Sequence, residues 1–262
     1  MSTNRRDLVK GAGAAVTLGM LASTFSAVLP RGARAADSAK GANCLTVIYP
    51  AGADVKFDAD YYRDHHLKTI MTLYGKTISR FELRKAAPAA AGAPPAAYSA
   101  AVNIWIADMD AFGKKNQEHG PTLVKDVPNF TNGQPTIQFD KIEGMMGSPA
   151  AAMKLGDSCL TILYPNGENV RWDVDYYRTH HMPLIMSLYK KEAIKRFELR
   201  KGDTGQAPGS KPAYIGSVNI YIKDQKAFEE AGKKNGQALR DDVPHFSSAQ
   251  PTVIPTVIYG VA

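Results

Sequence analysis

The sequence lacks the patterns typical of enzymes that handle nucleotides, metals or acyl groups. It has no glycine-rich phosphate loop, no dinucleotide fingerprint and no Ser-His-Asp pattern. Its two cysteines, Cys44 and Cys159, have no metal-ligand spacing around them. An oxidising compartment would permit a disulfide between them, and two separate buried thiols are the other interpretation. We expect no metal site.

A broad basic surface is also missing, although the net charge is +7. Five basic residues and Asp7 give +4 within residues 1–35, so the remainder carries about +3 and no nucleic-acid partner is expected. The apolar run at 11–29 is interrupted by Ser, Thr and Gly. It is too weakly apolar to predict a stable membrane anchor.

The N-terminus instead has the pattern of an export signal. The run Asn4-Arg-Arg-Asp-Leu-Val-Lys10 resembles the twin-arginine motif, and Ala33-Arg-Ala35 offers a small-x-small cleavage site. We therefore predict a twin-arginine signal peptide at 1–35 and a periplasmic or secreted protein that is exported folded. A buried or membrane helix is the alternative.

The chain contains an internal duplication. The run Asp58-Ala-Asp-Tyr-Tyr-Arg-Asp-His-His66 recurs as Asp173-Val-Asp-Tyr-Tyr-Arg-Thr-His-His181, and Arg-Phe-Glu-Leu-Arg-Lys occurs at 80–85 and again at 196–201. Cys44 and Cys159 occupy equivalent places. The predicted organisation is repeat 1 at 44–144, a linker at 145–158 and repeat 2 at 159–262.

Each repeat shows the same order of strand and helix patterns. In repeat 1 we expect a strand at 44–49, a helix capped by Asp58, strands at 79–85 and 98–106, a helix from Asp108 to about His119, a loop at 126–130 and a strand at 135–143. The order β-α-β-β-α-β is that of a ferredoxin-like unit. The predicted fold class is α+β: two ferredoxin-like repeats form an intramolecular pseudo-dimeric α/β barrel.

The segment Tyr176-Tyr-Arg-Thr-His-His-Met-Pro-Leu184, with the later Asp-Val-Pro-x-Phe loop of each repeat, resembles the EthD family of the dimeric α/β-barrel superfamily. The resemblance covers both repeats. It implies a role in the degradation of ethers and other small organic compounds, alongside oxidoreductase systems. Superfamily relatives include isomerases, cyclases, monooxygenases and haem enzymes.

The family motif assigns its histidine to His181 and, through the repeat, to His66. The aromatic residue one turn earlier is Tyr177 or Tyr62. Repeat 1 departs from the motif because Lys68 and Thr69 stand where repeat 2 has Pro183 and Leu184. The resemblance therefore favours His181 over His66.

Helical spacing predicts the same residues. Tyr62 and His66 share a helix face, as do Tyr177 and His181, whereas the preceding histidine of each pair points about 100° away. An imidazole suits acid/base catalysis near neutral pH. The alternative is a core histidine that is satisfied by hydrogen bonds.

The sheets offer further candidates. The predicted ligand-lining residues are Asn103, Trp105, Asn219 and Tyr221, on the inner faces; packing between the two sheets is the alternative. Alternating charges at Arg80, Glu82 and Arg84, and at 196, 198 and 200, predict an ion-paired, exposed strand face, or arginines that bind an acidic ligand. The long inserts at 86–97 and 202–213 are either spacers or lids over a cavity.

We expect an exported protein that acts on or binds a small hydrophobic or aromatic compound, as an oxidoreductase or an acid/base enzyme. The alternatives are a non-catalytic periplasmic binding protein and, by the resemblance, a haem protein. Whether the chain is an enzyme stays open, and no cofactor is predicted. The expected assembly is a monomer with an internal pseudo-dimer, or a higher homo-oligomer.

Overall fold

The computed structural model describes residues 40–88, 95–207 and 209–262. The predicted signal peptide at 1–35 lies outside the described residues. In repeat 1 the elements are β1 (Asn43–Pro50), α1 (Ala59–Tyr61), η2 (Tyr62–His66), α2 (Leu67–Tyr74), η3 (Gly75–Thr77), β2 (Ile78–Ala86), β3 (Tyr98–Ile106), α3 (Met109–Asp126), η4 (Val127–Asn129) and β4 (Thr136–Gly147).

Repeat 2 follows the same order after a short helix. Its elements are η5 (Ala150–Ala152), β5 (Ser158–Pro165), α4 (Val174–Tyr176), η6 (Tyr177–His181), α5 (Met182–Ala193), β6 (Ile194–Gly205), β7 (Tyr214–Ile222), α6 (Gln225–Phe246) and β8 (Thr252–Val261). No helix in the described part of the chain combines the length and hydropathy of a membrane span.

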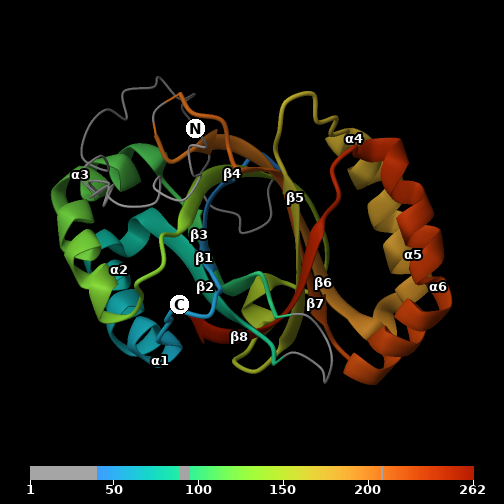
Figure 1. The fold of residues 1–262 in the computed structure, drawn as a ribbon, viewed down its shortest axis with the longest axis horizontal. Coiled ribbons are helices and arrows are strands. Elements are labelled where there is room, and N and C mark those ends of the chain that lie inside the picture. Colours follow the sequence, from blue (N-terminus) through green and yellow to red (C-terminus); the bar gives the residue numbers. More distant parts are fainter. Residues whose placement is uncertain (1–39, 89–94, 208) are drawn as a thin grey trace, which may run out of the picture.

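The eight strands form one closed antiparallel barrel in the order β1-β3-β2-β8-β5-β7-β6-β4. Each repeat contributes four neighbouring strands, and the two sheets join where β2 pairs with β8 and β4 pairs with β6. The helices of the two repeats lie outside the barrel on opposite sides (Figure 1). This architecture confirms the predicted α+β pseudo-dimeric barrel.

Aspartate caps begin the major helical segments, as the sequence predicts. Asp58 accepts the Tyr61 N–H at 2.9 Å, and Asp108 accepts the Ala111 N–H at 2.9 Å; such a cap stabilises a helix by about 1 kcal/mol. The second helix of each repeat is longer than expected, since α3 passes through Pro121 and ends at Asp126. Leu123 and Val127 pack on the core beyond the proline, and this contact favours the extra turns.

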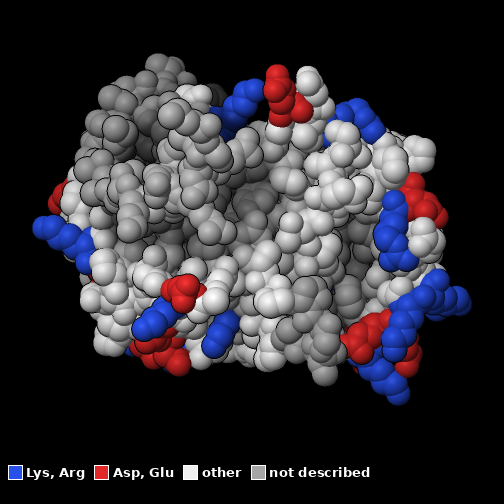
Figure 2. Space-filling model, viewed as in Figure 1, with Lys and Arg blue, Asp and Glu red and all other residues white. Residues whose placement is uncertain are grey.

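The apolar core is divided between the two repeats. One cluster lies between the outer face of the first sheet and its helices, and a second occupies the same place in repeat 2. Charged side chains stay at the periphery of the face in Figure 2. They gather at its lower right, where Figure 1 places α5 and α6. The centre of that face is largely uncharged.

The barrel interior is polar, which overturns one expectation. Arg80, Glu82 and Arg84, with Arg196, Glu198 and Arg200, were expected on an exposed strand face, but all six are buried inside the barrel. The alternating pattern identified one face of the strand correctly. That face is covered because the two sheets close on each other, and Glu82 pairs directly with Asn103 on the same inner face.

Ion pairs and hydrogen bonds in this interior join the two repeats. Arg80 Nη2 donates to Glu198 Oε2 at 2.9 Å, and Tyr221 Oη donates to Glu82 Oε2 at 2.7 Å. Cys44 and Cys159 are also buried there as free thiols, and burial raises the pKa of each to about 12. Each thiol is therefore protonated at neutral pH.

Candidate functional site

The two Tyr-Tyr-Arg-x-His-His segments share an unusual backbone. Tyr62–His66 and Tyr177–His181 each form a π-helix, and the Leu67 N–H bonds the Tyr62 carbonyl five residues back. Such π-turns occur frequently at functional sites. Because the turn is present in repeat 1, which has Lys68 in place of Pro183, it does not depend on the proline.

The π-turn of repeat 1 brings His66 to a carboxylate. His66 Nδ1 lies 2.8 Å from Asp126 Oδ2. The other oxygen, Asp126 Oδ1, accepts hydrogen bonds from Tyr61 Oη at 2.8 Å and from Asn129 Nδ2 at 2.8 Å. Tyr62 packs against the His66 ring with centroids 4.9 Å apart. The histidine is therefore held on one side by a fixed carboxylate and on the other by an aromatic ring.

Repeat 2 contains the same pair. His181 Nδ1 lies 2.6 Å from Asp242 Oδ2, and Tyr176 Oη donates to Asp242 Oδ1 at 2.9 Å. Tyr177 packs on His181 with centroids 4.8 Å apart. In place of Asn129, repeat 2 has His245, whose ring stacks on Tyr176.

The surroundings determine the protonation of these groups. Burial lowers the pKa of His66 below its usual 6.5 and outweighs the opposing effect of Asp126. Burial acts to raise the pKa of Asp126, but hydrogen bonds from Asn129, His66 and Tyr61 outweigh it, so the pKa is lowered. At neutral pH the pair is therefore a neutral imidazole and a carboxylate. The Nδ1–H donates to Asp126, and Nε2 has a free lone pair.

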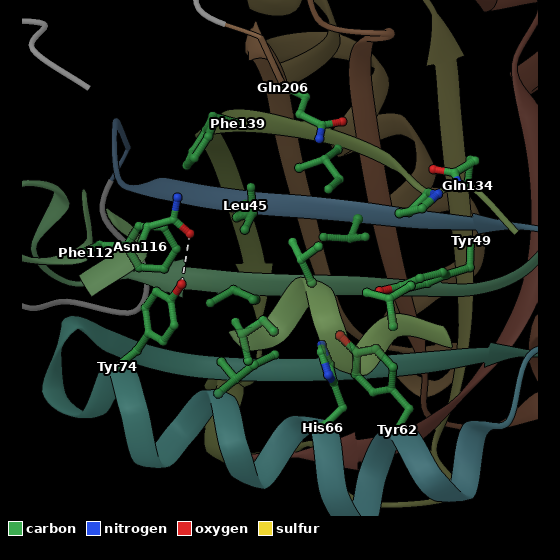
Figure 3. A pocket seen from close by; sticks show the side chains of 18 residues that line it. Leu45, Tyr49, Tyr62, His66, Tyr74, Phe112, Asn116, Gln134, Phe139 and Gln206 are labelled. Atoms are coloured by element: carbon green, nitrogen blue, oxygen red, sulfur yellow. Dashed lines mark hydrogen bonds between the residues drawn. The ribbon is translucent and has the colours of Figure 1, made fainter. Parts of the chain in front are cut away.

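A cavity of about 140 Å³ lies beside this pair, between α2 and α3 and the outer face of the first sheet. His66 and Tyr62 line one side of it, and Tyr74 and Asn116 lie at another, with the Tyr74 hydroxyl donating to Asn116 Oδ1 (Figure 3). No Lys, Arg, Asp or Glu is found among the described residues that line it. An apolar cavity of about 150 Å³ accommodates a benzene molecule, so this one suits a small neutral ligand built around one aromatic ring.

The structure separates the eight predicted site residues into two groups. Tyr62, His66 and their counterparts Tyr177 and His181 lie between the helices and the outer sheet face. The predicted ligand-lining residues lie on the inner face instead: Asn103, Trp105, Asn219 and Tyr221. They belong to the packed, ion-paired barrel interior, and none of the four lines the cavity.

Asp126 and Asp242 were not among the residues predicted for the site. Each lies about 60 residues from its histidine, so only the tertiary fold shows the pairing. One signal was available, since both begin the Asp-Val-Pro-x-Phe motif that recurs in the two repeats. The first tyrosine of each pair was also missed; Tyr61 and Tyr176 hold the carboxylates in place.

Haem was one of the expected alternatives, and the site does not suit it. A cavity of about 140 Å³ is comparable to one that holds benzene, which is far smaller than a porphyrin. The described lining residues also include no Arg or Lys that could pair with the haem propionates.

No family model and no curated relative matches the chain. Among solved structures, a proposed monooxygenase from Fusobacterium nucleatum is similar over 84% of this chain and 94% of its own, with 9% identity and a TM-score of 0.53. An anthrone oxidase-like protein is similar over 86% of this chain and 93% of its own, with 8% identity and a TM-score of 0.50.

An EthD-like protein from Ralstonia eutropha is similar over 42% of this chain and 92% of its own, with 21% identity and a TM-score of 0.36. At these identities the similarity concerns the fold. The chain shares an α+β barrel fold with the first two of these structures, and both halves of its barrel come from one polypeptide.

Proposed function

We propose that the cavity of repeat 1 binds a small, neutral, hydrophobic organic compound and that His66 acts on it as an acid/base residue. One observation supports this above all. His66 lines the cavity while its Nδ1 is engaged by Asp126, which is not part of the lining. Nε2 is therefore the ring nitrogen left for a ligand.

The geometry supports a simple proton transfer. Nε2 accepts a proton from an acidic C–H or O–H of the ligand, and the carboxylate of Asp126 stabilises the imidazolium that forms. Nε2 then returns the proton to the ligand or to its product. Such general base catalysis contributes roughly 10²–10⁴-fold to a rate.

We further propose that the reaction belongs to the degradation of small organic compounds, as in an EthD-type system outside the cytoplasm. The twin-arginine-like leader and the helix motif support this. The names of two similar structures, a monooxygenase and an anthrone oxidase-like protein, favour oxidation by dioxygen after deprotonation. Tyr62 would keep the His66 ring in position during either reaction.

Deuterium uptake tests the acid/base role without knowledge of the natural substrate. The probe is 2-indanone, a compact neutral ketone whose C–H groups beside the carbonyl exchange slowly with D₂O. We expect the protein to accelerate exchange, His66→Gln to lose about 10²-fold or more of this acceleration, and the matched variant His181→Gln to retain most of it. Equal losses in the two variants, or none in either, would contradict the assignment.

A non-catalytic carrier is the second candidate, favoured by the apolar lining and the partly exposed mouth of the cavity. A carrier would bind 2-indanone and one-ring phenols without accelerating exchange or consuming oxygen. His66→Gln would then leave the binding constants nearly unchanged. Calorimetric titration, run beside the exchange assay, distinguishes the two functions.

A further inference from the structure

The cavity of repeat 1 is completed by a residue of repeat 2. Strand β6 runs to Gly205 and pairs with β4 of repeat 1, so that Gln138 lies opposite Gly205. The next residue, Gln206, lines the cavity. This segment is part of the 202–213 insert, which the sequence left open between a spacer and a lid.

Backbone hydrogen bonds link described residues on either side of position 208 in this insert. The Gly205 N–H donates to the Ser210 carbonyl at 2.9 Å, and the Ser210 N–H donates to the Ala207 carbonyl at 3.0 Å. A Cβ at Gly205 would lie 2.5 Å from the Lys211 carbonyl oxygen, so a glycine is needed there. These contacts hold Gln206 at the edge of the cavity.

A side chain of repeat 1 bonds the backbone of Tyr214, the residue that follows the insert. Gln138 Oε1 accepts the Tyr214 N–H at 2.8 Å, and Gln138 Nε2 donates to the Tyr214 carbonyl at 3.0 Å. Gln138 is buried. The equivalent residue at the other junction is Ile254, which cannot make these bonds. The two junctions of the barrel are therefore chemically different.

Gln206 is well placed to recognise the end of a ligand. In Figure 3 it lies on the opposite side of the cavity from His66. Gln134, from the segment before β4, is also exposed at the rim. An amide donates and accepts hydrogen bonds without charge. Its best match is an uncharged hydroxyl or carbonyl, since an ionised group would lose its hydration with no counter-ion among the described lining residues.

We propose that Gln206 is a specificity-determining residue of the repeat 1 site. It selects neutral aromatic ligands that carry an uncharged hydrogen-bonding group opposite the end that reaches His66. Gln138 is a positioning residue that acts through the backbone of Tyr214, where the insert ends. This inference rests on the proposed function, because it assumes that the cavity is a ligand site.

The test compares two probes that differ by one hydroxyl, 4-(hydroxymethyl)phenol and 4-methylphenol, by calorimetric titration. A net hydrogen bond of about 0.5–1.5 kcal/mol corresponds to a roughly 2- to 13-fold preference. We expect the wild type to prefer the hydroxymethyl compound by this factor, Gln206→Leu to lose or reverse the preference, and Gln250→Leu, at the exposed equivalent of Gln134 in repeat 2, to retain it.

Gln138→Ala provides a second variant, in which we expect the preference to fall while Gln206 itself is unchanged. An unaltered preference in Gln206→Leu would overturn the inference, as would a wild type that binds neither phenol. A different result would contradict the proposed function. A wild type that shows the Gln206-dependent preference yet never accelerates deuterium exchange would support this inference and contradict acid/base catalysis.

Discussion

The two repeats contain the same histidine–aspartate pair in different surroundings. The His66–Asp126 and His181–Asp242 distances are 2.8 and 2.6 Å, and both histidines are buried. The residues around the pairs have diverged. The cavity-lining residues Asn116, Val124 and Phe139 correspond by the repeat to Gly232, Arg240 and Pro255.

The residues that position the histidine are shared by the two repeats, whereas the residues that line the cavity differ. The π-turn, the aspartate cap and the first tyrosine are needed to place the histidine, and both repeats retain them. The lining sets which molecule can approach. Arg240 puts a cation at the position of Val124, so a ligand near His181 would meet different chemistry. The motif alone favoured His181, whereas the cavity favours His66.

The largest effect should come from the carboxylate. Asp126→Asn weakens the support for the imidazolium and for the Nδ1–H tautomer, so we expect a loss of roughly 10²-fold or more in kcat for 2-indanone exchange. Asp242→Asn should have little effect. Comparable losses in the two variants would show that the repeats act alike.

The pH profile of the same assay tests the electrostatic coupling between Asp126 and His66. The active form is the neutral His66, so the wild-type rate should rise with pH through a pKa below 6.5 and then level off near neutrality. The Asp126 charge acts to raise that pKa. Asp126→Asn should therefore move the acid limb to lower pH while it lowers the plateau. An unmoved limb would argue against direct coupling between the two groups.

The sequence predicts the fold well because each strand, helix and cap pattern occurs twice, once in each repeat. Helical spacing also places Tyr62 and His66 on one face correctly, while His65 is exposed and packs on Tyr61. The π-turn is not visible in the sequence, since it keeps the same residues on the buried side as an α-helical turn would.

Two features depend on long-range contacts and could not be predicted. Alternation groups Arg80, Glu82 and Arg84 on one face, but charge suggests that this face is exposed, and only barrel closure shows it to be buried. The cavity requires residues from both repeats. Gln206 lies within a Gly- and Pro-containing insert, and nothing in that composition indicates that it reaches the other repeat.

The two repeats also differ inside the barrel, because Asp140 of repeat 1 corresponds to Thr256 of repeat 2. Burial raises the pKa of Asp140 to about 6, against the opposing effects of Arg200, Thr46 and Gln138. Protonated Asp140 therefore favours folding. This stability is fully present below the unfolded pKa of about 3.9 and is lost as pH rises through 6, a change worth about 3 kcal/mol.

Asp140→Asn removes this titration. The wild type should lose up to about 3 kcal/mol of unfolding free energy through this titration between pH 4 and pH 7.5, and the variant should not. Urea unfolding at both pH values measures the difference, with Thr256→Ser as the matched control. Parallel pH dependences in Asp140→Asn and the wild type would rule out the proposed titration.

The smallest effect on stability is expected at the residue that ends the first long helical segment of each repeat. Lys190 has φ 62° and ψ 167°, a conformation that strongly favours glycine, and its counterpart in repeat 1 is Gly75 with φ 52°. A Cβ at Gly75 would meet nothing within 4 Å, so the backbone alone decides the outcome. Lys190→Gly should stabilise the protein by about 1 kcal/mol, and Gly75→Lys should destabilise it by roughly 1–3 kcal/mol. Urea unfolding with the reverse order of stabilities would contradict the account of this backbone.

We expect the ligand of this protein to lie in the cavity beside His66. A crystal structure of the protein soaked with 4-(hydroxymethyl)phenol is the decisive test of this site. We predict electron density for the ring between His66 and Gln206, with one hydroxyl within hydrogen-bonding distance of His66 Nε2. Density only beside His181, only in the barrel interior, or nowhere would contradict the claim.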